Sequence, residues 1–146
     1  MKRILVATDG SEGGDRAVDY ATRLAKTVGA ELLIVNIANL SDLQAKKAFE
    51  ELARVEHTSV GELLTAFSER VLVSAVDRAK QHGASMIQTR SGHGNVARAI
   101  LEIAHRENAS PIVVGRRGLG RWEALFLGSV SNRLANLAPQ AVVVVP

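Results

Sequence analysis

Two glycine-rich segments carry the residues that are best suited to bind a ligand. Asp9 follows an apolar run within Thr8-Asp9-Gly10-Ser11, and its carboxylate can accept hydrogen bonds from hydroxyl groups. The second segment runs from Gly115 to Ser131 and combines glycines with serines and arginines. Glycines let a backbone approach a ligand closely, and the free N–H groups at a helix N-terminus favour a phosphate. Binding of a phosphorylated ligand is one interpretation of this pattern.

Both segments also have a purely structural interpretation. Ser129 and Ser131 lie where Gly128 opens a helical pattern, and a serine at that position can simply cap the helix. The glycines can simply make turns. Asp9 can be a turn residue or a helix cap. The residues by themselves leave both interpretations open.

The patterns of several enzyme classes are missing. Without cysteine there is no disulfide scaffold, thiolate zinc site or cysteine nucleophile. The chain has no G-x-x-x-x-G-K-(S/T), no G-x-G-x-x-G after the first apolar run and no G-x-S-x-G. Histidines and carboxylates nowhere have the spacing of a metal site, so we assign no catalytic residue and no metal ligand. Whether the protein is an enzyme stays open.

The elements that would position these residues alternate along the chain. Short apolar runs, which predict strands, span 4–7, 32–37, 85–89, 112–114 and 141–145. Helical patterns lie between them, with the first ending at Gly29 and a break near Val60 and Gly61. Residues 39–47 are expected to form a polar connection. This alternation predicts right-handed crossovers and one doubly wound α/β domain over residues 1–146.

In a doubly wound fold, ligands bind at the carboxyl ends of the strands where the strand order reverses. The loops at those ends are therefore the informative ones. They contain Asp9, the start of the segment at Gly115, and Ser91-Gly92-His93-Gly94. His93 could reach a ligand there, although a single histidine in a loop is more often just exposed.

Composition excludes further classes. The chain has 146 residues, of which 47% are apolar and 23% charged, so it is expected to be one globular domain. The net charge is +3, but the basic residues are spread out and aromatic residues make up only 3%, so nucleic-acid binding is not expected. The apolar runs at both ends are too short for a signal peptide or a membrane span, which predicts a soluble, cytoplasmic protein.

Three segments together resemble the universal stress protein family. Gly115-x2-Gly118-x9-Gly128-Ser129 fits the G-2x-G-9x-G-(S/T) pattern of the ATP-binding branch of that family. The opening residues 4–11 resemble its first strand and Asp-Gly-Ser turn, and residues 142–145 resemble its last strand. The resemblance covers essentially the whole chain in order. It implies a five-stranded parallel sheet in the order 3-2-1-4-5, with ATP lying near the ends of strands 1 and 4.

The resemblance also implies an ATP site, position by position. Asp9 would hydrogen-bond the ribose or adenine side, and the residues around adenine would be Ala7, Thr8 and Ile37. The residues around the ribose and phosphates would be Gly115, Arg117 and Gly118. The residues holding the phosphates would be Gly128, Ser129, Val130 and Ser131. Mg²⁺ would arrive with ATP and keep most of its waters.

The function expected from this resemblance is regulatory. ATP would act as a ligand switch in a stress response, with at most slow hydrolysis or autophosphorylation, and the output would pass to a separate protein partner. A nucleotide-independent interaction module of the same fold is the main alternative, and an adenylate-forming enzyme is a third. The last strand, residues 141–145, would lie at an apolar sheet edge, and the resemblance implies a homodimer through it.

Overall fold

The computed structural model describes residues 2–40, 43–116 and 128–146, and over them the chain alternates strands and helices. The strands are β1 (Arg3–Ala7), β2 (Glu31–Ala38), β3 (Ile87–His93), β4 (Ile112–Gly115) and β5 (Val142–Val145). The helices are α1 (Glu12–Val28), α2 (Leu43–Val55), α3 (Val60–Gln81), α4 (Val96–Arg106) and α5 (Ser129–Leu137). The predicted alternation of strands and helices is therefore confirmed.

The strands of the described chain form one parallel sheet in the order β3-β2-β1-β4-β5. This confirms both the doubly wound α/β class and the strand order implied by the family resemblance. The chain builds outward from β1 through β2 to β3, then crosses back to place β4 on the other side of β1. The strand order thus reverses between β1 and β4, where this class of sheet opens a crevice at the carboxyl ends of its strands.

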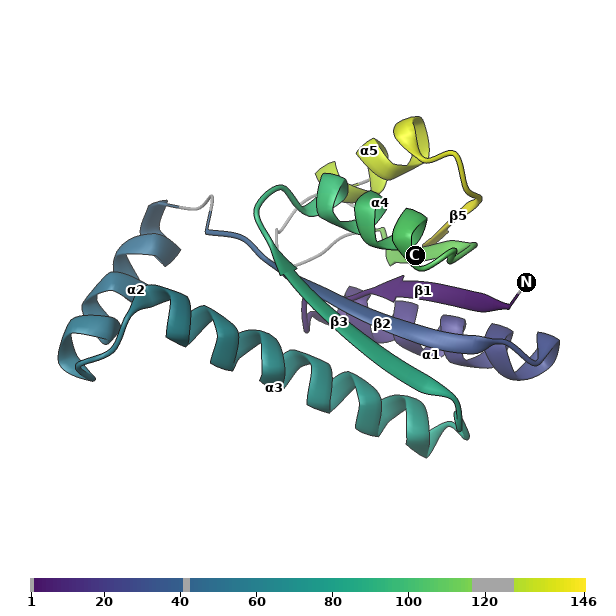
Figure 1. The fold of residues 1–146 in the computed structure, drawn as a ribbon, viewed down its shortest axis with the longest axis horizontal. Helices are drawn as coiled ribbons and strands as arrows, with labels where there is room; N and C mark the ends of the chain where they lie inside the picture. Colours follow the sequence, from purple (N-terminus) through teal and green to yellow (C-terminus); the bar gives the residue numbers. More distant parts are fainter. Residues whose placement is uncertain (1, 41–42, 117–127) are drawn as a thin grey trace.

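Helices cover both faces of the sheet, with α1 and α3 on one face and α4 and α5 on the other (Figure 1). Side chains along β1 alternate between the two layers. Ile4 and Val6 pack under α1 and α3, whereas Leu5 packs under α4 and α5. All three are fully buried. The α2 helix and the first turns of α3 extend beyond the end of the sheet (Figure 1).

Helix ends follow local sequence signals. Ser11 caps α1 by accepting from the backbone N–H of Gly14 at 3.1 Å, and Asn95 caps α4 by accepting from Arg98 at 3.0 Å. Ser59 caps α3 in the same way. The predicted end of α1 is confirmed, because Gly29 adopts the left-handed conformation with φ of 71° that suits glycine.

The predicted boundaries of β3 and α2 were wrong. Residues 91–93, expected in a loop, belong to β3 and pair with residues 36–38 of β2. Backbone pairing is indifferent to their polar side chains. The α2 helix starts at Leu43, inside the expected polar connection. The predicted break near Val60 and Gly61 is confirmed, because residues 56–59 separate α2 from α3 and Val60 is the first residue of α3.

Ion pairs on the α4 side of the sheet connect the edge strand β3 to β1 through Glu107. Glu107, which follows α4, contacts Arg3 of β1 at 2.6 Å and Arg90 of β3 at 2.7 Å. The hydrogen bond from Arg90 lowers the pKa of Glu107. None of the helices within the described ranges is long and apolar enough to cross a membrane.

Candidate functional site

A tight turn at the end of β1 holds Asp9. The N–H of Thr8 donates to the carbonyl of Val35 at 3.0 Å, and the hydroxyl of Thr8 accepts from the N–H of Gly10 at 3.2 Å. One carboxylate oxygen of Asp9, Oδ1, accepts from both the N–H and the hydroxyl of Ser11. Asp9 is half-buried, and these two hydrogen bonds hold its carboxylate at the carboxyl end of β1.

The first turn of α1 lies directly against this turn because Gly14 has no side chain. A Cβ at Gly14 would lie 2.4 Å from Oγ1 of Thr8 and 3.1 Å from Oδ1 of Asp9. The first distance is far below any normal contact. Gly14 was not among the predicted site residues. Its only signal in the sequence is a glycine inside an otherwise helical pattern, where glycine is unfavourable unless close packing requires it.

The end of β4 is tied to the start of α5. The N–H of Arg116 donates to the carbonyl of Val145 at 2.7 Å, and the carbonyl of Arg116 accepts from the N–H of Gly128 at 2.6 Å. The buried hydroxyl of Ser131 lies 3.0 Å from the carbonyls of both Arg116 and Gly128 and can donate its proton to one of them. These bonds place the N-terminus of α5 next to the end of β4.

The N-terminus of α5 differs from the capped ends of α1, α3 and α4. Its N-cap is Gly128, which makes no side-chain capping bond. Ser129 is exposed, and Val130 is half-buried against the core beneath α4 and α5. The first turn of a helix carries backbone N–H groups that no intrahelical carbonyl satisfies, together with the positive end of the helix dipole. Such an end suits a phosphate or another anion.

Apolar members of the predicted site lie on the same side of the sheet. Ala7 and Ile37 are half-buried and pack, like Val130, against the core between the sheet and helices α4 and α5. Ile37 also lies against Gly92 of β3, where a Cβ would come within 3.0 Å of its Cδ1. The ends of β1 and β2 thus present an apolar surface beside Asp9.

The structure therefore places most of the predicted residues at the carboxyl ends of the strands. Ala7, Thr8 and Asp9 end β1, Ile37 lies near the end of β2, Gly115 ends β4, and residues 128–131 start α5. Arg117 and Gly118 lie outside the described residues. Among the residues that are described, no three of His, Cys, Asp or Glu come close enough to hold a metal ion.

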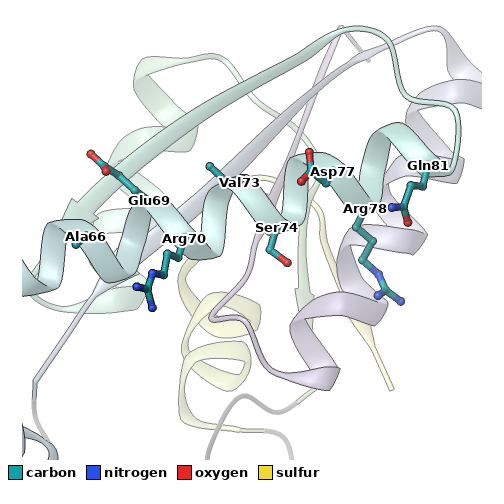
Figure 2. A pocket seen from close by; sticks show the side chains of 8 residues that line it. All are labelled: Ala66, Glu69, Arg70, Val73, Ser74, Asp77, Arg78 and Gln81. Atoms are coloured by element: carbon teal, nitrogen blue, oxygen red, sulfur yellow. The ribbon is translucent and has the colours of Figure 1, made fainter.

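A separate hollow of about 680 Å³ lies along α3 and is lined by Ala66, Glu69, Arg70, Val73, Ser74, Asp77, Arg78 and Gln81. Figure 2 shows Arg70, Ser74 and Arg78 pointing to one side of the helix and Glu69, Val73 and Asp77 to the other. All its lining residues come from this one helix, and their charges are mixed. It does not share a residue with the strand ends, so we do not assign the site to it.

Known proteins are similar to this chain over its whole length. The family model described as the universal stress protein family matches residues 1–146. A universal stress protein of Thermus aquaticus, encoded in a QAH/OAS sulfhydrylase 3′ region, is 35% identical over 146 residues, covering 99% of this chain and 98% of that protein. Universal stress protein YxiE of Bacillus subtilis is 30% identical over 148 residues, covering 99% of each.

A solved structure is similar along almost its full length. It is the crystal structure of a universal stress protein in complex with cAMP, with 29% sequence identity and a TM-score of 0.73, and the match covers 99% of this chain and 97% of that one. The family model, the curated relatives and this structure agree with the motifs at both ends of the chain. The protein belongs to the universal stress protein family.

Proposed function

We propose that the protein binds ATP in the crevice between the ends of β1 and β4 and uses it as a regulatory ligand in a stress response. The observation that carries this proposal is the reversal of strand order between those two strands. It brings the Asp9 turn and the start of α5, whose N-cap Gly128 makes no side-chain capping bond, to neighbouring strand ends. A carboxylate suits the hydroxyls of a ribose, and a helix N-terminus suits phosphates.

A relative supports the nucleotide as the ligand. The universal stress protein solved with cAMP shares 29% of its residues with this chain over nearly the whole length. The glycine pattern Gly115-x2-Gly118-x9-Gly128-Ser129 favours a ligand with several phosphates, because it combines close backbone approach with a helix start. ATP carries several phosphates and therefore fits both the glycine-rich backbone and the helix start.

The residues present fit such a ligand. Asp9 would bind the ribose or adenine side, and Ala7, Thr8 and Ile37 would lie beside the base. Residues 128–131 would receive the phosphates, and Gly115, Arg117 and Gly118 are predicted to contact the ribose and phosphates. When bound with ATP, Mg²⁺ neutralises phosphate charge and keeps most of its waters. The sequence offers no general base beside a nucleophile, so we expect binding to dominate over hydrolysis or autophosphorylation.

We also propose that the protein is a homodimer that pairs through β5 and passes its output to a separate protein partner. The strand is apolar and lies at the edge of the sheet, where unpaired backbone groups favour pairing with another chain. The cytoplasmic location stays a prediction.

The first test is to denature freshly purified protein, identify any released nucleotide by chromatography, and titrate the protein with ATP and AMP. Asp9→Asn keeps an oxygen that can accept from Ser11 but removes the charge. We expect it to weaken ATP binding by about 10- to 100-fold, the range for hydrogen bonds to a charged group. Gly118→Ala should weaken binding as well.

The matched control is Asp77→Asn, which removes an exposed carboxylate from α3 and should bind ATP like the unmodified protein. Protein that carries no nucleotide and shows no ATP-dependent thermal shift would contradict the proposal. The nucleotide-independent interaction module would then be the better explanation of this fold.

A further inference from the structure

One polar side chain interrupts the buried part of β2. Residues 32–35 are fully buried and apolar, but the next residue, Asn36, is also buried, with only 3% of its surface exposed. A buried amide that lacks partners costs about 1–3 kcal/mol. An asparagine at this position therefore requires specific partners, and the structure supplies them.

Both ends of the Asn36 amide are engaged. Its Nδ2 donates to the backbone carbonyl of Thr8 at 2.9 Å, and its Oδ1 accepts from the hydroxyl of Ser68 at 2.7 Å. Ser68, on α3, is itself only 4% exposed. The carbonyl of Thr8 can only accept, so the amide must turn its NH2 group toward β1 and its oxygen toward Ser68. The carbonyl of Thr8 therefore sets the orientation of the amide, and the hydroxyl of Ser68 donates to the amide oxygen and holds it in place.

The bond to Thr8 acts at the point where the sheet ends. The register of β1 and β2 stops at the pair Ala7–Val35, and the carbonyl of Thr8 lies one residue further along. That carbonyl and the N–H of Asp9 belong to one planar peptide group. By holding the carbonyl, Asn36 sets the plane of the peptide from which the Asp9 carboxylate projects.

A second contact joins α3 to the same turn. Gly10 has a φ of 83°, and a Cβ there would lie 3.3 Å from Cγ2 of Val71. Val71 and Ser68 are three residues apart on α3 and so share one face of the helix. The face of α3 that holds Asn36 thus also supports the residue after Asp9.

We propose that Asn36 and Ser68 are positioning residues for the nucleotide, acting on it through the Thr8–Asp9 peptide. This inference rests on the proposed function and deepens it, because it assigns to α3 a share in the affinity of the site. Neither side chain contacts the ligand. Their contribution is to hold Asp9 in the orientation that binds it.

The test compares two serine-to-alanine variants of the same helix by calorimetric titration with ATP. Ser68→Ala removes the donor that holds the Asn36 oxygen, and we expect ATP affinity to fall by about fivefold, the weight of one neutral hydrogen bond. Ser74→Ala, at an exposed position of α3, should leave affinity unchanged. Ser68→Thr keeps the hydroxyl and should restore affinity to within about twofold. Thermal unfolding of each variant checks that it is folded.

A double-mutant cycle separates positioning from a general loss of structure. If Ser68 acts through Asp9, Ser68→Ala should cost less than about twofold in an Asp9→Asn background, since residues coupled through one hydrogen-bond network are non-additive. Independent, multiplicative losses would overturn the inference. Asn36→Leu provides a second variant, expected to weaken binding at least as much as Ser68→Ala.

The outcomes distinguish this inference from the proposed function. If the unmodified protein binds ATP and both folded variants, Ser68→Ala and Asn36→Leu, bind it equally well, only the positioning role fails. If the unmodified protein binds no ATP, the proposed function and the positioning role both fail.

Discussion

At the scale of residues, a two-pronged ion pair joins Asp19 of α1 to Arg78 of α3. The two carboxylate oxygens of Asp19 accept from Nε and Nη2 of Arg78 at 2.7 and 2.8 Å. Asp15 and His82 also face this pair, each with a contact of 3.7 Å. The hydrogen bond from Arg78 lowers the pKa of Asp19, and it outweighs the opposing effect of burial.

This pair predicts a specific response to acid. Because the pKa of Asp19 in the folded protein lies below its ordinary value of 3.8, its contribution to stability is present above that value and is lost as the pH falls through the folded pKa. Asp19→Asn should therefore lower the free energy of unfolding at about pH 7 and flatten its decline below about pH 4. Urea unfolding at several pH values measures both effects.

The control for acid sensitivity is Glu69→Gln, which changes an exposed carboxylate of α3. It should leave the pH profile close to that of the unmodified protein. An Asp19→Asn profile that runs parallel to the unmodified one at every pH would contradict the role of this ion pair.

The two serines of α5 show where residue-level prediction ends. The sequence placed both hydroxyls at the start of a helix, but residues two apart on a helix point about 200° apart. Ser129 is exposed, whereas Ser131 is buried with its hydroxyl at the carbonyls of Arg116 and Gly128. Those partners could not be inferred without knowing that the end of β4 lies beside the start of α5. Whether Ser131 also holds a phosphate stays a prediction.

At the scale of elements, the contact between α1 and the Asp9 turn reverses the usual effect of replacing a glycine in a helix. Replacing a helical glycine with alanine usually stabilises a helix. At Gly14 the added methyl would meet Oγ1 of Thr8 at 2.4 Å, so α1 would have to move away from the turn. We expect Gly14→Ala to lower the free energy of unfolding by about 1–2 kcal/mol and to weaken ATP binding.

The matched change in another helix is Gly61→Ala in the first turn of α3. There the nearest atom to an added Cβ is Oγ of Ser59 at 3.8 Å, an ordinary contact. This variant should be stabilised by about 0.5 kcal/mol, by analogy with other permissive sites. Denaturant unfolding compares the two variants, and a stabilised Gly14→Ala would show that α1 does not press on the turn.

Strands were predicted accurately where burial on both faces requires a continuous run of apolar residues. The runs at 4–7, 32–37 and 112–114 lie in β1, β2 and β4, which are buried on both faces. It was less accurate for β3, an edge strand with the polar sequence IQTRSGH, whose extent is set by pairing with β2. The strand ends that carry the site followed from the fold class. Asn36 and Ser68 did not, because their roles depend on which distant element packs against them. Gly14 did not either, because its role depends on how closely α1 approaches the Asp9 turn.

At the scale of the whole molecule, the two edges of the sheet differ. The edge strand β5 is composed of valines, whereas β3 at the other edge carries Arg90 in an ion pair with Glu107. The N–H groups of Ile112 and Arg116 donate to the carbonyls of Ala141 and Val145. Since peptide groups alternate in direction along a strand, those of Val142 and Val144 point to the open edge.

This geometry predicts how to disrupt the proposed dimer. Val144→Pro removes an outward N–H without removing a bond to β4, and proline is tolerated at such an edge position. We expect light scattering to give twice the chain mass of 15.6 kDa for the unmodified protein and the single mass for the variant. Circular dichroism should show that the variant keeps its fold. A single-chain mass for the unmodified protein at micromolar concentration would contradict pairing through β5.

The difference between the edges limits how far assembly can proceed. In a two-fold pair through β5, each copy presents the same strand to the other, so the contact consumes both apolar edges at once. The joined sheet then ends at β3 on both sides, where a charged, polar strand disfavours the addition of another chain. Pairing of this kind is self-terminating, and the protein would remain a discrete particle instead of growing into a fibre.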